Sequence, residues 1–206
     1  MKMRKMRKKL LLVGAMSLIL FACKKNSSDD PKPNKPLDPG AGESENITRV
    51  ALYLTNQSTN KIDTVEWKDV DGDGVGNPPK IDTMRLVANI SYNVKVKIFD
   101  DTKNPVDTIS HEVEEEANSH IFHYTFKPNT ANSLSITTSN LDKDKLSPPL
   151  PLGLNFDLIT DQNSGEGSFE VVLRHFGPGV TKTDKPSDGE EDLKIAFPTK
   201  VEILQK

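Results

Sequence analysis

Cysteine is nearly absent from this sequence: Cys23 is the only one among 206 residues. A single cysteine excludes an intrachain disulfide and a zinc site built from several thiolates, so the fold has to be stabilised by an apolar core. The 160 residues from position 47 onward are enough for this. A domain of about that size buries roughly 70% of the surface that its unfolded chain exposes.

Long hydrophobic runs are also lacking. The most apolar stretch, Leu10 to Phe21, rises about 18 Å as a helix, whereas the hydrocarbon layer of a membrane is roughly 30 Å thick. It follows a basic head at positions 2–9 and leads into Ala22 and Cys23. This order predicts a bacterial lipoprotein signal over residues 1–22, with cleavage after Ala22 and a lipid attached to Cys23. An uncleaved anchor and an ordinary signal peptide are the two alternatives.

An excess of positive charge is missing from the expected mature chain. The whole sequence has 27 Lys+Arg and 30 Asp+Glu, and six of the basic residues lie in the signal, which leaves about nine net negative charges. This balance disfavours binding to nucleic acid and electrostatic attraction to an anionic membrane. We therefore expect no nucleic-acid partner, and contact with membrane lipid only through acyl chains on Cys23.

Residues 23–46 hold the lipidated cysteine and a segment with little to bury. Four prolines favour extended chain, and the other residues are mainly Lys, Asp, Ser, Asn and Gly, so we predict a flexible tether; the prolines are Pro31, Pro33, Pro36 and Pro39. Lys24, rather than an aspartate, follows the anchor residue, which favours the outer membrane. The sequence leaves open whether the domain faces the periplasm or the cell surface.

From Ile47 onward, apolar residues mostly recur at every second position. This is the period of a half-buried strand, and eight or nine such segments are bounded by Gly, Pro, Asn and Asp. No helices alternate with them, which disfavours a parallel βαβ architecture. Residues 47–206 are therefore predicted to form an all-β domain, an antiparallel β-sandwich with one short helix. Representative inward positions are Val50, Leu52, Leu54, Val94, Val96, Phe122, Phe156, Phe169 and Leu173.

Three segments depart from simple alternation. In residues 107–119 the apolar positions fall four apart and glutamates fill the polar side, which predicts a short helix capped by Asp107 or Thr108; a charged strand is the alternative. Residues 81–87 form a less regular strand candidate. The last segment places apolar residues up to Ile203 on one face, but Pro198 lacks a donor, which predicts an edge strand or a strand divided in two.

An acidic stretch after the second predicted strand resembles a calcium-binding loop. Asp69, Asp71 and Asp73 alternate with other residues, and a glycine occupies the sixth place, as in a loop that wraps carboxylate oxygens around Ca²⁺. The twelfth place, however, is Lys80 instead of glutamate. A plain connection between two strands is therefore the alternative, since Asp-Gly repeats form turns without a metal.

Two of the four histidines share the parity of core residues. His120 lies two positions before Phe122, and His175 continues the alternation of Val171 and Leu173, so this parity allows the two rings to meet inside the sandwich or at its rim. With a glutamate such as Glu116 nearby, they form a candidate transition-metal site. A buried, hydrogen-bonded histidine pair without a metal is the alternative.

Motifs for catalysis are missing. The sequence has no Gly-x-Ser-x-Gly turn and no His-Glu-x-x-His pair, and the glutamates at positions 112–116 are explained by a solvated face. Aromatic residues make up 6%, and those in the strands mostly have core parity, so an exposed stacking platform is not expected. We therefore expect a protein that is not an enzyme.

Four stretches together resemble a family of small Bacteroidota lipoproteins over nearly all of residues 47–205: Val65 to Gly74, Lys103 to Glu116, His120 to Tyr124 and Leu173 to His175. Some members are labelled type 1 periplasmic binding fold superfamily proteins, a fold of two α/β lobes for which this sequence is too short. The resemblance implies association with an outer-membrane receptor of the TonB-dependent type. It also implies that the recurrent positions correspond to Asp69, Asp71, Asp73, His120 and His175, as fold features or as a site.

Two hypotheses for function follow from these observations. The first is a binding or accessory module on the outer membrane, which captures a small ligand or metal or docks on a transport receptor. The second is a structural or adhesive envelope module that has no small-molecule ligand.

Overall fold

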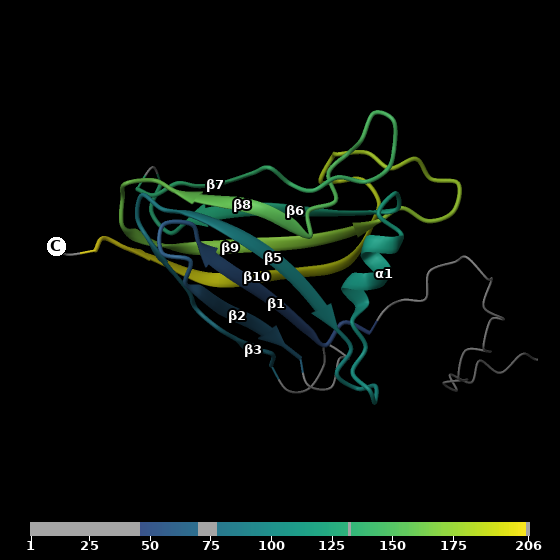
Figure 1. The fold of residues 1–206 in the computed structure, drawn as a ribbon, viewed down its shortest axis with the longest axis horizontal. Helices are drawn as coiled ribbons and strands as arrows, with labels where there is room; N and C mark the ends of the chain where they lie inside the picture. Colours follow the sequence, from purple (N-terminus) through teal and green to yellow (C-terminus); the bar gives the residue numbers. More distant parts are fainter. Residues whose placement is uncertain (1–45, 70–77, 132, 205–206) are drawn as a thin grey trace, which may run out of the picture. The chain divides into compact units, whose positions relative to one another are not determined.

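The computed structural model describes residues 46–69, 78–131 and 133–204. Within this part, ten strands form two sheets that pack against each other, and one short helix accompanies them (Figure 1). The prediction of an all-β sandwich with a single short helix is confirmed for these residues. The predicted signal, Cys23, the tether up to position 45, Asp71 and Asp73 lie outside the described residues.

The first sheet has six strands, each antiparallel to its neighbours. Their order across the sheet is β3 (Lys80–Ile81), β2 (Ile62–Lys68), β1 (Arg49–Asn56), β5 (Ser91–Phe99), β8 (Asn155–Thr160) and β7 (Ile136–Ser139). Strands β1 and β5 form the centre, and their alternating valines and leucines point toward the second sheet.

The second sheet has four strands, in the order β4 (Met84–Val87), β10 (Glu190–Glu202), β9 (Gly165–His175) and β6 (His120–Pro128). Strand β9 is antiparallel to both of its neighbours, whereas β4 runs parallel to β10. The single strand expected over residues 81–87 is divided between the sheets, because residues 80–81 join the first and 84–87 the second. This division raises the number of strands to ten.

The core lies between the inner faces of the two sheets. Its largest fully buried side chains come from both sheets at the positions that the alternation predicts, and burial of each stabilises the fold by roughly 1.5–3 kcal/mol. They include Phe122, Phe156, Phe169, Phe197, Leu52, Ile98, Leu158, Leu173, Val50 and Val94.

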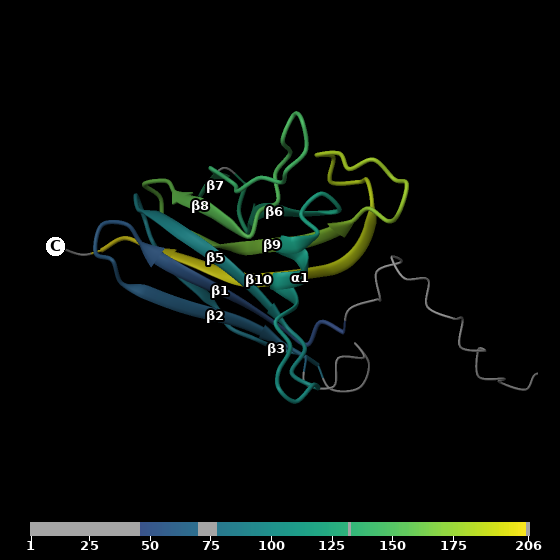
Figure 2. The same cartoon turned by 45° about the vertical axis from the view of Figure 1, so that its right-hand side comes forward.

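Helix α1 (Ile109–Glu115) lies within the predicted range 107–119 and packs beside the end of β5, as Figure 2 also shows. Thr108 is its N-cap residue, although its side chain makes no capping hydrogen bond. Ile109 and Val113 are buried, and the glutamates point outward, as the four-residue spacing predicts. None of the helices in the described part of the chain has the length and apolar character that a membrane span requires.

Two expectations about the last strand are wrong. Strand β10 runs without interruption through Pro198 and lies between β4 and β9, so it is neither divided nor at an edge. It accommodates the proline because β4 pairs with β10 only from Thr199 to Glu202, so the missing N–H at Pro198 removes no bond to β4. Ile203 is not inward: it follows the end of the strand and is 60% exposed.

Candidate metal centre

His120 and His175 meet across two neighbouring strands. They lie directly opposite each other in the register of β6 and β9, at the end of the sheet near α1 (Figure 1). Their rings stack with centroids 4.6 Å apart and planes 11° from parallel. His120 is buried and His175 is half-buried, so the pair lies at the rim of the sandwich and one ring is reached from outside. The two rings thus contact each other at the rim of the sandwich, as the parity of the two strands allows.

Glu116 supplies a third donor to the same place. It follows the last residue of α1, and its carboxylate is exposed. One oxygen of Glu116 and one ring nitrogen from each histidine all lie within 4.8 Å of one another. These three residues form the candidate metal centre. Within the part of the chain that the structure describes, no other group of three or more such side chains lies close enough together to hold an ion.

The backbone fixes the orientation of the His120 ring. Its Nδ1 lies 3.2 Å from the carbonyl oxygen of Glu116, an acceptor, so Nδ1 carries the hydrogen. In the neutral ring, Nε2 is then the atom with a free lone pair, which is the arrangement common in metal-binding histidines. Burial, reinforced by the charges of His175 and Lys182, lowers the pKa of His120 to about 4, although the bond to Glu116 opposes this shift. His120 is therefore neutral at pH 7 and does not have to lose a proton before binding a metal.

Closure on an ion requires a small rearrangement. Donors around a tetrahedral zinc lie about 3.3 Å apart, given bonds of roughly 2.0–2.1 Å. Stacked rings also direct their lone pairs along parallel planes, so one ring has to tilt for both to reach a single ion. His175 is the ring free to do so, because His120 is buried and hydrogen-bonded. The exposed Glu116 side chain can approach by changing its rotamer.

A buried ion pair that sequence analysis did not predict lies close to this centre. The Lys182 ammonium donates to Asp144 at 2.8 Å and to the carbonyl of Ala117 at 2.9 Å, and both charged side chains are fully buried. Ala117 directly follows Glu116, so this pair fixes the backbone on which the carboxylate is mounted. The pair therefore supports the geometry of the centre without belonging to it.

The predicted calcium loop lies mostly outside the described residues, so Asp69, Asp71 and Asp73 remain a prediction. Asp69 follows the end of β2, is buried, and donates its N–H to the carbonyl of Thr48 at 2.8 Å. Lys68 and Lys80 are paired in the register of β2 and β3. The acidic stretch thus lies between the antiparallel strands β2 and β3, which agrees with the alternative of a plain connection between two strands. This arrangement does not test whether the stretch binds calcium.

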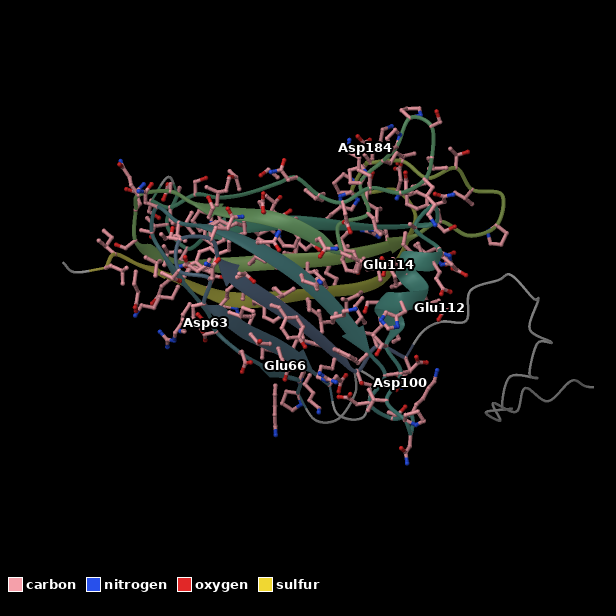
Figure 3. All side chains as sticks on the ribbon, in the orientation of Figure 1. Asp63, Glu66, Asp100, Glu112, Glu114 and Asp184 are labelled. Carbon is pink, nitrogen blue, oxygen red and sulfur yellow. The ribbon has the colours of Figure 1, made fainter. Side chains whose placement is uncertain are left out.

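The remaining acidic groups and histidines are dispersed. The acidic residues labelled in Figure 3 lie on β2, after β5, on α1 and in the segment before β10. His111 is exposed on α1, and His123 points to the face opposite to His120, as the strand parity predicts. Burial lowers the pKa of His123. Neither ring joins the centre at Glu116.

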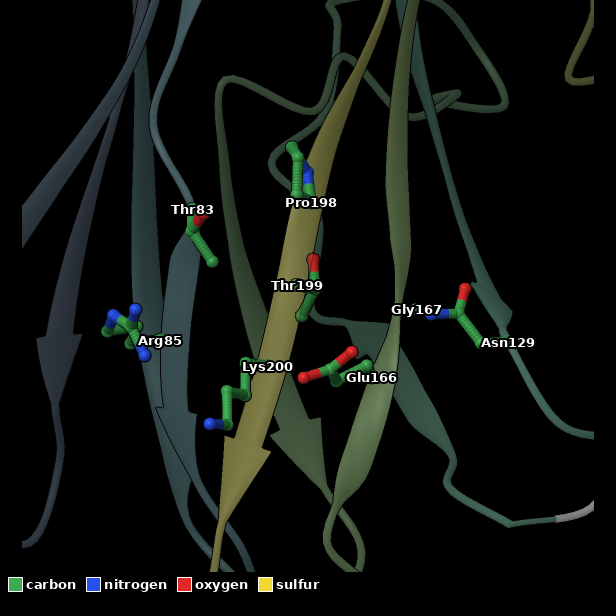
Figure 4. Close-up of a pocket in the computed structure, with 8 residues that line it drawn as sticks. All are labelled: Thr83, Arg85, Asn129, Glu166, Gly167, Pro198, Thr199 and Lys200. Carbon is green, nitrogen blue, oxygen red and sulfur yellow. The ribbon is translucent and has the colours of Figure 1, made fainter.

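A polar depression of about 320 Å³ lies where β4 falls short of the length of β10 (Figure 4). Two basic side chains line it, Arg85 and Lys200, and both contact the same carboxylate, Glu202, at 3.9 and 3.1 Å. Glu202, together with Glu166, which also lines the depression, balances these two positive charges. We therefore assign it no ligand.

Comparisons with known proteins yield no relative for this chain. No family model, no curated protein and no solved structure matches it.

Proposed function

We propose that this chain is a lipid-anchored, non-enzymatic binding module of the outer membrane that holds a transition-metal ion between Glu116, His120 and His175. The observation that carries the proposal is the convergence of two imidazoles and one carboxylate, all within 4.8 Å of one another, at an accessible rim. The anchor is Cys23, and the proposed partner is an outer-membrane transport receptor to which the module presents its ion.

The donor set selects the class of metal. Two nitrogens and one carboxylate oxygen suit Zn²⁺, Cu²⁺ or Ni²⁺, whereas Ca²⁺ and Mg²⁺ prefer a shell of oxygens. Three protein donors leave one position of a tetrahedral ion for water or for a group from a partner. Such an incomplete shell suits a protein that receives and passes on its ion. We place the chain among binding proteins because its sequence has neither a nucleophile motif nor a metalloprotease motif.

Isothermal titration with Zn²⁺ and Ni²⁺ tests this proposal. The protein is the full chain carrying Cys23→Ser, so that no thiol competes for the metal. We expect one equivalent to bind, and we expect His120→Ala/His175→Ala to lower the affinity at least about a hundredfold, because two of three ligands are lost. Glu116→Gln lowers it less. His111→Ala, which removes an exposed histidine outside the centre, is the matched control and leaves binding unchanged.

Two outcomes would contradict the metal site. One is the absence of binding by the parent chain, and the other is equal binding by the double variant. A variant that has lost its fold is recognised by its circular dichroism. In that case, His175→Gln alone decides the question, because His175 is only half-buried and its replacement leaves His120 in place.

A structural or adhesive envelope module is the second candidate. The stacking of the two rings and the hydrogen bond of His120 to Glu116 together explain the histidines without an ion. Under this alternative, the chain binds none of the metals, and replacing the histidines lowers stability alone.

A further inference from the structure

A second depression lies on the other sheet, on the outward faces of β1 and β5 near the start of α1. Its volume is about 420 Å³, which is within the range of small-molecule sites. It is lined by Tyr53, Lys95, Lys97, Phe99, Thr108 and His111. We call it the β1/β5 groove. It shares no residue with the metal centre, which is built on α1, β6 and β9.

Two aromatic side chains form the apolar part of the groove. Tyr53 and Phe99 occupy outward positions and are exceptions among the strand aromatics, most of which point into the core as expected. Phe99 is held from one side by Arg49, whose guanidinium carbon lies 3.9 Å from the ring centroid. Arg49 is itself bound to Asp101 at 2.9 Å and to Glu66 at 3.2 Å. The ring of Phe99 is therefore fixed before any ligand arrives.

The charge of the groove has one sign. Lys95 and Lys97 point to the same face of β5, and no carboxylate in the described residues lies within salt-bridge distance of either ammonium group. The neighbouring basic residues differ, since Arg49 and Lys68 both pair with Asp101. No acidic side chain lines the groove. Two unpaired cations beside apolar walls are unexpected on a chain whose mature form is net negative.

We infer that the β1/β5 groove binds a small organic anion that carries an apolar ring. Lys95 and Lys97 receive its carboxylate, sulfate or sulfonate group, and the ring lies against Tyr53 and Phe99. An anion without an apolar body gains little from these lysines in water, and a neutral ring leaves them uncompensated, so the groove selects for both properties together. This inference does not depend on the proposed metal function.

Titration with naphthalene-2-sulfonate tests the groove, again on the full chain carrying Cys23→Ser. We expect saturable binding of one equivalent, which weakens as salt is raised from about 0.05 to 0.5 M. Lys95→Gln/Lys97→Gln is expected to lower the affinity about tenfold and to remove most of the salt dependence. Both lysines lie on the outward face of their strand, so the double variant keeps the fold, which its unfolding transition verifies.

Two controls make the result specific. Lys145→Gln/Lys194→Gln removes the same charge from exposed positions outside the groove and leaves the affinity unchanged. Naphthalene-2-methanol, a neutral molecule with the same rings, binds at least tenfold more weakly than the sulfonate. Absence of saturable binding, equal loss in the two double variants, or equal affinity for the two probes would each overturn the inference.

Discussion

At the scale of single residues, Lys182 and Asp144 form an ion pair in which both side chains are fully buried. Asp144 also accepts hydrogen bonds from the N–H groups of Leu146 and Leu150, at 3.0 and 2.9 Å. Burial raises the pKa of Asp144, but the bonds from Lys182 and from the two N–H groups outweigh it, and the pKa is lowered. The carboxylate is therefore ionised at neutral pH. Burial lowers the pKa of Lys182, and the contact with Asp144 opposes this.

Removing the Lys182 ammonium group alone should strongly destabilise the fold. Lys182→Met leaves Asp144 buried without its partner, and such a break typically costs about 3–5 kcal/mol in the free energy of unfolding. Urea denaturation measures the loss. Lys182→Met/Asp144→Leu should recover most of it, because no unpaired charge remains. Lys185→Met, at an exposed position three residues along, should change stability by less than about 0.5 kcal/mol. Equal losses in Lys182→Met and Lys185→Met would contradict the role of the pair.

Residue-level patterns indicated some of these sites and missed others. The parity of His120 and His175 with core residues placed both on the inward face, because alternation fixes the face of a strand. Their contact also requires the pairing of β6 with β9, which parity does not predict. Lys182 was not predicted, since lysine is rarely buried and its partner lies 38 positions away. The groove aromatics were missed, although one signal existed: Tyr53 stands between Leu52 and Leu54 and so has outward parity.

At the scale of elements, the junction of β6 and β9 depends on a position without a side chain. Gly167 lies opposite Pro128, and the ring of Phe126 occupies the space beside it. A Cβ at this glycine would lie 2.5 Å from Cζ of Phe126 and 2.6 Å from the carbonyl oxygen of Lys127. The ring is a side chain that can move, but the oxygen belongs to the paired strand. Close approach of the two strands therefore requires glycine here.

We expect Gly167→Ala to destabilise the chain by about 1–3 kcal/mol, because the added methyl group forces β6 away from β9. Thermal unfolding followed by circular dichroism measures the effect. Gly177→Ala is the matched control: no heavy atom lies within 4 Å of its added Cβ, so its stability should match that of the parent. If Gly167→Ala unfolds at the same temperature as the control, the close approach of β6 and β9 at Gly167 does not contribute to stability.

The sequence predicted most elements but not their partners. Period-two alternation located the strands because a buried face repeats locally, and four-residue spacing located α1 for the same reason. Strand pairing depends on contacts between distant segments. The parallel pairing of β4 with β10 joins residues 84–87 to residues 199–202 and has no local signal. Pro198 likewise indicated an edge strand, because proline lacks a donor. Strand β4 pairs with β10 only from Thr199 onward, and the residues around Pro198 carry no signal of this partial pairing.

At the scale of the whole molecule, the two proposed sites lie on different sheets and rely on different interactions with their ligands. The candidate metal centre uses imidazole nitrogens and a carboxylate oxygen, whereas the β1/β5 groove uses cations on a strand face. Neither contributes a residue to the other. A chain with both proposed sites would hold a metal ion and an organic anion at once, and titrating each ligand in the presence of the other would show whether their affinities are coupled.

In the proposed lipoprotein, attachment to the membrane depends on the sulfur of Cys23. With about nine net negative charges in the expected mature chain, we expect no electrostatic attraction to an anionic membrane, so the proposed acyl chains on Cys23 would supply the binding. In a bacterium that processes lipoproteins, we expect the chain to incorporate labelled palmitate and to have the mass of a lipidated product that begins at Cys23. Cys23→Ser should incorporate none, because no other cysteine exists. An unlabelled parent chain that retains residues 1–22 and stays in the membrane fraction would instead show that the segment from Leu10 to Phe21 is an uncleaved anchor.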